Sequence, residues 1–168
     1  MSAQELEPWL RETHLGLPVI LRGVLHAYEQ AEEDILRWCG PLTDAEIHAT
    51  LHSLPSVAFQ MRHIVRSLDR LLTYAEGKPL DDVQAAALKA EHLATGSTAQ
   101  LLQEFAEGIP QAKNRLLGFA PEEFDRPRGI GRALIPATVG GILIHSAEHT
   151  QRHVGQAITT AKMVAALR

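Results

Sequence analysis

Residues 55–77 read PSVAFQMRHIVRSLDRLLTYAEG, and two neighbouring patterns run through them. The first is an apolar row at intervals of three and four, typical of the buried face of an α-helix; it consists of Val57, Met61, Ile64, Leu68, Leu71 and Ala75. The second is a polar row, which consists of Ser56, Gln60, His63, Ser67 and Tyr74. At about 100° per residue, the polar row lies on one flank of the apolar row. This segment predicts a helix that borders both a hydrophobic core and a polar pocket.

The segment 136–166 repeats this combination and predicts a second such helix. Its apolar row consists of Val139, Leu143, Ala147, Val154, Ile158 and Ala161. Its polar row consists of His145, His149, His153, Gln156 and Thr160. Two helices of this kind can enclose a hydrated pocket between their polar rows, and two solvated helix flanks are the alternative interpretation.

Two further long helices predict an all-α fold. Residues 18–38 carry an apolar residue at every third or fourth position, and Pro18 suits a first helical turn because its missing N–H would be unpaired there. Residues 97–117 are also helical in pattern, but Gly108 and Pro110 predict a kink or a break within them. Four long helices with few aromatic residues predict a four-helix bundle.

The 168 residues are expected to form one domain, with residues 1–15 as an N-terminal extension. Residues 43–51 predict a short helix in which Thr43 and Glu46 form a capping box. The remaining segments are expected to be loops, notably residues 121–131, because no alternating strand pattern is evident.

Composition narrows the possible functions. The net charge of −4 argues against a protein that grips a nucleic-acid backbone. The single Cys39 excludes a disulfide framework and an all-cysteine zinc site within one chain. No apolar run reaches the roughly 18 residues of a membrane span, and Glu5 and Glu7 stand where a signal peptide would carry positive charge. We therefore expect a cytoplasmic protein.

Nine histidines are an unusual number for this chain, and three of them share one helix face. His145, His149 and His153 are four residues apart, so adjacent rings lie one turn apart and can reach one ion with bonds of about 2.1 Å. A further ligand must come from another helix, and His63 is the best candidate because it lies in the polar row of residues 55–77. His26 is a weaker candidate, for a supporting position. The others are expected at the surface: His14, His48, His52 and His92.

The chain resembles the DinB/YfiT-like family of metalloenzymes. The resemblance extends from about residue 18 to residue 164, and it depends on His63 together with His149, His153 and the Gly155-Gln156 pair that follows. It implies an up-down-down-up four-helix bundle in which His63, His149 and His153 bind a divalent metal ion, most often zinc or nickel. It also implies a possible homodimer and, in some relatives, chemistry on low-molecular-weight thiols.

These observations predict a metal-dependent enzyme that acts on a small-molecule substrate, of the thiol S-transferase or hydrolase type. Because His145 extends the histidine pair to a triple, a site formed by His145 and His149 instead of His153 stays open. Residues expected to line the pocket or support the ligands are Gln60, Ser67, Tyr74, His145 and Gln156. Arg66 and Arg152 are candidates for binding an anionic substrate.

A non-catalytic metal-binding or ligand-binding bundle is the competing hypothesis. Asp69 and Glu148 are the carboxylates nearest to the predicted ligands in sequence, but the helical spacing directs neither toward them. The catalytic residues are therefore unknown. A thiol transferase would not need a strong protein base, because ligation to a metal ion deprotonates the thiol directly.

Overall fold

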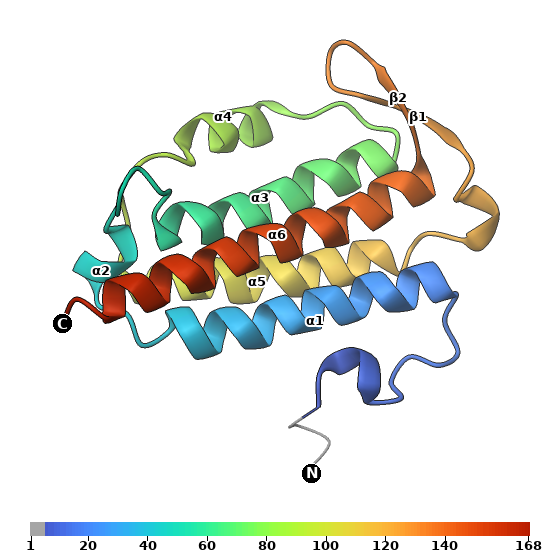
Figure 1. Cartoon of the computed structure of the whole chain (residues 1–168). Helices are drawn as coiled ribbons and strands as arrows, with labels where there is room; N and C mark the ends of the chain where they lie inside the picture. Colours follow the sequence, from blue (N-terminus) through green and yellow to red (C-terminus); the bar gives the residue numbers. More distant parts are fainter. Residues whose placement is uncertain (1–5) are drawn as a thin grey trace.

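The computed structural model describes residues 6–168, and its four long helices form a bundle (Figure 1). These helices are α1 (Val19–Cys39), α3 (Val57–Ala75), α5 (Thr98–Leu116) and α6 (Val139–Ala165). α1 and α6 run in one direction and α3 and α5 in the other (Figure 1). α6 packs against both α1 and α3, and α5 closes the bundle on the other side. The predicted all-α, up-down-down-up bundle is confirmed.

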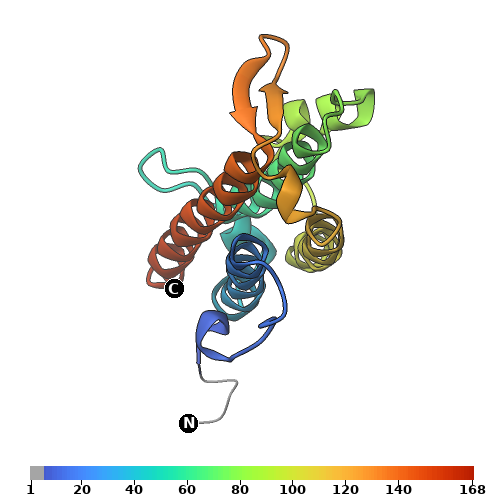
Figure 2. The ribbon, with the colours of Figure 1, turned by 90° about the vertical axis from the view of Figure 1, so that its right-hand side faces the viewer.

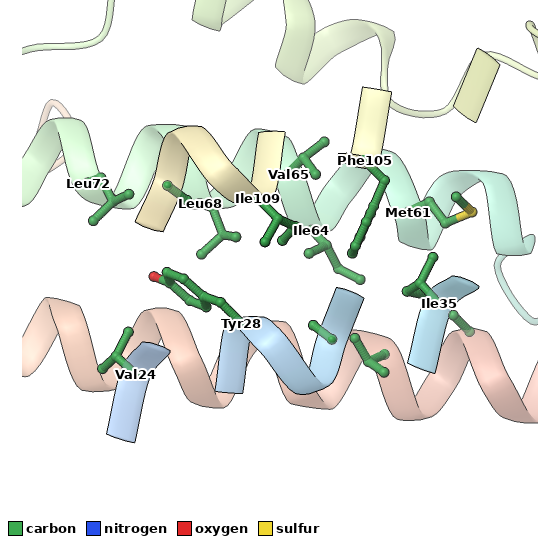
Figure 3. Close-up of a cluster of buried hydrophobic side chains, with 14 of the residues drawn as sticks. Val24, Tyr28, Ile35, Met61, Ile64, Val65, Leu68, Leu72, Phe105 and Ile109 are labelled. Atoms are coloured by element: carbon green, nitrogen blue, oxygen red, sulfur yellow. The ribbon is translucent and has the colours of Figure 1, made fainter. Parts of the chain in front are cut away.

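Apolar side chains from all four long helices fill the interior. Figure 3 shows Tyr28 of α1 directed toward the α3 and α5 side chains that it faces across the core. Its hydroxyl lies 2.6 Å from that of Ser146 on α6, which in turn donates to the carbonyl of Leu143. Buried hydroxyls need such partners because an unpaired one loses its hydrogen bonds to water without replacement.

Side-chain caps define where the helices begin. The hydroxyls of Ser56, Ser97 and Thr138 accept backbone N–H groups at the starts of α3, α5 and α6. The predicted capping box of Thr43 and Glu46 is present at the start of α2 (Asp44–His48). Such caps pair N–H groups that have no partner within the first helical turn.

Of the kink or break predicted near residue 108, the break is wrong, because α5 runs through Gly108 and Pro110 as one helix. A Cβ atom at Gly108 would lie 2.9 Å from two side-chain carbons of Val65. Glycine therefore lets α5 pack closely on α3 at this point.

Three features of the connections also differ from the sequence-based prediction. A short helix, α4 (Asp82–Ala90), follows α3 in the chain and packs against it, and a hairpin of β1 (Pro127–Ile130) and β2 (Ile135–Thr138) projects beside α4 (Figures 1 and 2). Part of the segment 121–131 is therefore a strand and not a loop. The last helix begins at Val139 and not near Pro136, because Pro136 lies opposite Gly129 in the hairpin.

The chain before α1 folds back along that helix. A single 3₁₀ turn, η2 (Pro8–Leu10), contacts α1, and Arg11 pairs with Glu33 of α1. Residues 1–5 of the predicted N-terminal extension, Glu5 among them, lie outside the described residues. Within residues 6–168, no helix is long and apolar enough to cross a membrane.

Candidate metal centre

Three histidines from two helices converge on one point. His63 comes from α3, and His149 and His153 come from α6, the helix that packs most extensively on α3. One ring nitrogen from each lies within 4.8 Å of the other two, and all three side chains are half-buried. The Nε2 atoms of His63 and His149 are 2.9 Å apart. The structure therefore brings together the three histidines that the sequence singled out.

The ring spacing is close to that of imidazoles sharing an ion. The centroid of His63 lies 4.9 Å from that of His149 and 4.4 Å from that of His153, and the last two are 4.5 Å apart. Two imidazoles bound to one tetrahedral ion by bonds of about 2.1 Å have centroids about 5 Å apart. Small side-chain rotations would therefore make room for an ion.

A buried carboxylate fixes the outer nitrogen of His63. Oε2 of Glu91 lies 2.8 Å from Nδ1 of His63, and its other oxygen accepts a bond from Arg70 at 2.5 Å. Burial alone would raise the pKa of Glu91, but the hydrogen bonds to His63 and Arg70 outweigh it and hold that pKa below its ordinary value. An ionised Glu91 keeps the proton of His63 on Nδ1, so that Nε2 faces the other histidines.

An amide oxygen fixes the outer nitrogen of His153 in the same way. Oε1 of Gln60 lies 2.6 Å from Nδ1 of His153, and Gln60 is almost fully buried. The Nδ1–H donates to Gln60, which leaves the lone pair of Nε2 for a metal ion. His63 and His153 thus carry their proton on Nδ1 and leave Nε2 for a metal ion. Glu91 and Gln60, which contact the outer nitrogens, determine this tautomer.

The two α6 histidines of the cluster, His149 and His153, are held in their neutral form. Burial, followed by the positive charge that His153, His63 and other neighbours can carry, lowers the pKa of His149 to about 4. Burial and the neighbouring His63 and Arg152 likewise lower the pKa of His153 to about 4, against the opposing effect of a hydrogen bond to Gln156. Because only neutral imidazole can bind a metal, both rings are competent ligands at pH 7.

Aromatic stacking supports one side of the site. The ring of Phe59 stacks on His63 with centroids 5.4 Å apart and on His92 at 4.9 Å. His92 is exposed, as expected, but its stack with Phe59 makes it a part of the wall beside His63.

The other predicted pocket residues fall at different distances from the histidine cluster. His145 is exposed, and its ring centroid lies 5.6 Å from that of His149, so it borders the cluster without joining it. Gln156 is exposed beside His153. Ser67 is buried and donates to the carbonyl of Ile64 in its own helix. Gln60 and Gln156 are thus the pocket residues that contact a histidine of the cluster.

Tyr74 belongs to a different hollow of about 910 Å³ between α4 and the β1–β2 hairpin. It lies eleven residues along α3 from His63, which is about 16 Å of helix. Tyr74 is half-buried and packs against the hydrophobic core, so it does not line the histidine cluster as predicted.

Asp69 and Glu148, the carboxylates nearest to the predicted ligands in sequence, interact with other residues. Asp69 pairs with Arg115 at 2.6 Å, and Glu148 is exposed with an oxygen 3.7 Å from Nδ1 of His145. Sequence reasoning missed Glu91, because the 28 residues that separate it from His63 conceal their contact. A carboxylate at the end of α4 could have been found only by predicting α4 and its docking on α3.

The remaining histidines lie away from the cluster or at the surface. His26 is buried on α1, where Nε2 lies 3.1 Å from the hydroxyl of Thr13, so it does not support the cluster. His14 and His52 are exposed, as expected. His48 is half-buried, and its Nε2 lies 2.7 Å from the carbonyl of Gly96.

Comparison with known proteins places this arrangement in a family. The sequence profile of the DinB superfamily matches residues 27–157, a range that holds all three clustered histidines together with Gln60 and Glu91. The chain belongs to the DinB superfamily. The resemblance inferred from the histidine pattern is thereby confirmed.

A solved structure shares the fold of this DinB-superfamily chain. It is described as a conserved protein from Enterococcus faecalis, and it superposes with a TM-score of 0.73 over 89% of this chain and 99% of its own length. At 18% sequence identity the likeness extends to the fold alone. Among curated proteins, none is significantly similar to this chain.

Proposed function

We propose that this protein is a metal-dependent enzyme that acts on small molecules, with one divalent ion, zinc or nickel, held by His63, His149 and His153. The observation that carries the proposal is the convergence of three imidazoles whose outer nitrogens, on His63 and His153, are tied to Glu91 and Gln60. Three histidine ligands leave at least one coordination position open, which is typical of catalytic and not of structural zinc.

An ion in this position would lower the pKa of a water molecule or a thiol enough to produce a nucleophile near neutral pH. The chain's own residues hold the rings in place: Glu91 and Gln60 orient His63 and His153 from behind. On the exposed side, Gln156 can hydrogen-bond a substrate. Arg152 is exposed there too, whereas Arg66 is already paired with Glu104 at 2.9 Å.

Thiol transfer is favoured over hydrolysis by the state of Glu91. This carboxylate touches the histidine cluster, but both of its oxygens are engaged, by His63 and by Arg70. It is therefore unavailable to accept a proton from water. A low-molecular-weight thiol as substrate needs no such base, because the metal ion itself favours the thiolate.

The same engagement of Glu91 also favours the second candidate, a bundle that binds a metal ion or a ligand without catalysis. The two candidates differ in turnover. Tag-free, zinc-loaded or nickel-loaded protein should be assayed against low-molecular-weight thiols with a panel of electrophiles, alongside the His149→Ala variant. Metal-dependent loss of thiol that the variant lacks would establish an enzyme. Metal binding without turnover of any thiol–electrophile pair would contradict thiol transfer and favour the non-catalytic alternative.

We further propose that the protein is a cytoplasmic homodimer that does not bind nucleic acid. The family resemblance supports the dimer, and so do the exposed Val19 and Leu36 on α1. The net charge of −4 argues against nucleic acid. Sedimentation of the purified protein at several concentrations tests the dimer.

A further inference from the structure

We propose that His14, His26 and Glu29 form a second divalent transition-metal site, on the opposite side of α1 from the core. A ligand atom from each lies within 4.8 Å of the others. His26 and Glu29 are three residues apart on α1, and His14 comes from the segment that folds back along this helix. The site joins two separate parts of the chain, and two of its three residues precede the range that matches the superfamily.

The distances suit a shared ion. Nε2 of His14 lies 2.8 Å from Oε1 of Glu29, and the ring centroids of His14 and His26 are 5.7 Å apart. That separation exceeds by about 0.7 Å the roughly 5 Å expected for two imidazoles on one tetrahedral ion, so a modest rotation of the exposed His14 ring would bring the two into range. An ion pair between His14 and Glu29 would account for the first distance alone, whereas His26 lies beside that pair with its Nε2 3.1 Å from the hydroxyl of Thr13.

The surrounding contacts hold the site without help from an ion. Arg11 donates to the carboxylate of Glu33 and to the carbonyl of Leu6 at 2.7 Å, which anchors the folded-back segment one turn along α1. His14 adopts a left-handed backbone conformation with φ of 59°, which is uncommon for a residue other than glycine. The ligands are therefore placed before binding, which lowers the entropic cost of capturing an ion.

The donor set defines the class of ion. Two imidazoles and one carboxylate suit zinc, cobalt, nickel or iron, whereas magnesium and calcium prefer oxygen ligands alone. His26 is 8% exposed, but His14 is more open and borders solvent, so water can complete the coordination. An ion here would fasten the segment before α1 to the bundle, in contrast with the open site that we propose at His63.

Metal content tests this site independently of the first one. Tag-free protein should be stripped with a chelator, loaded with Zn²⁺, freed of excess ion and measured by atomic emission. We expect two ions per chain in the wild type, and one in both Glu29→Gln and His149→Ala. Glu33→Gln is the matched control, because it breaks the neighbouring tether of the same segment but should still retain two ions.

A second variant, His14→Ala, guards against an effect of Glu29→Gln on folding, and circular dichroism should show wild-type helix content in both. If both variants retain as much zinc as the wild type, the proposed site is overturned. Failure of the His63 site would look different, because His149→Ala would then lose nothing while Glu29→Gln still lost one ion. In the His149→Ala background, Zn²⁺ should raise the thermal midpoint only when His14 is present.

Discussion

Oε2 of Glu91, a side chain only 3% exposed, lies 2.8 Å from Nδ1 of His63. Glu91 follows the short helix α4, and His63 lies in the middle of α3. The contact therefore connects the segment between two bundle helices to the histidine cluster. Because the far oxygen of Glu91 binds Arg70, the carboxylate cannot turn away, and the ring of His63 is fixed in both tautomer and direction.

The variant Glu91→Gln should weaken zinc binding by about 10- to 100-fold, because glutamine can still accept a bond from His63 but carries no charge to support its basicity. Competition with a chromophoric chelator measures the change. Glu104→Gln is a matched control, since it neutralises a carboxylate on α5 that pairs with Arg66, a residue of the same helix as His63. Equal affinities for the two variants would show that Glu91 has no role in holding the ligand.

Gln60→Leu should also weaken zinc binding, by about 10-fold or more, because Nδ1 of His153 loses its acceptor while the buried volume is nearly retained. Gln60 acts on His153 and Glu91 on His63, two rings that share the ion, so the loss in the double variant should deviate from the sum of the single losses when expressed as free energies. The same titration in wild type and single and double variants measures this. Wild-type affinity in Gln60→Leu would contradict the assigned orientation of His153.

The histidine register can be tested by counting ions. His149→Ala and His153→Ala should each lose one zinc ion per chain, because the geometry gives each ring one position in the cluster. His145→Ala and His48→Ala should lose none. Loss of the ion in His145→Ala together with its retention in His153→Ala would place the site one helical turn earlier.

The stability of the metal-free protein should fall as the pH is lowered from about 6.5 to 4. The pKa values of His149 and His153 are lowered to about 4 in the folded protein, so the unfolded chain binds more protons in this range. The free energy of unfolding then decreases with falling pH. Urea unfolding at pH 7 and pH 5 measures it, and replacing both histidines by alanine should flatten the difference. An equally steep dependence in that variant would assign the effect to other groups.

Gly108→Ala should destabilise the bundle by about 1–2 kcal/mol, because the added Cβ meets Val65 and the cost of overpacking exceeds the gain in helix propensity. The same substitution in a Val65→Ala background should be neutral or stabilising. Urea unfolding of the four proteins gives the coupling. An equal loss in both backgrounds would show that the close approach of α5 to α3 is unimportant.

Periodicity was sufficient to predict the parts of the structure that bury apolar faces. The four long helices, the capping box of Thr43 and Glu46 and the shared face of His149 and His153 all follow from spacing along one helix. The pairing with His63 depended on the polar row beside the apolar row.

The missed elements lack such a signal. Every residue of α4 is at least partly exposed, so it has no apolar row to detect. The hairpin strands have four residues each, and Pro127 and Pro136 interrupt any alternating pattern. The contact of Glu91 with His63 was missed as well, because Glu91 directly follows α4 and its position depends on how α4 packs. The close approach of α5 to α3 brings Gly108 next to Val65, and spacing along one helix cannot reveal a relationship between residues 43 positions apart.

Anomalous diffraction from a zinc-loaded or nickel-loaded crystal, measured at the absorption edge of the metal, tests the central claim most directly. We expect a peak about 2.1 Å from one nitrogen each of His63, His149 and His153, with Nδ1 of His63 still bonded to Glu91. A loaded crystal with no peak among these three rings, or with a peak bound by His145 and His149 while His153 points away, would contradict it.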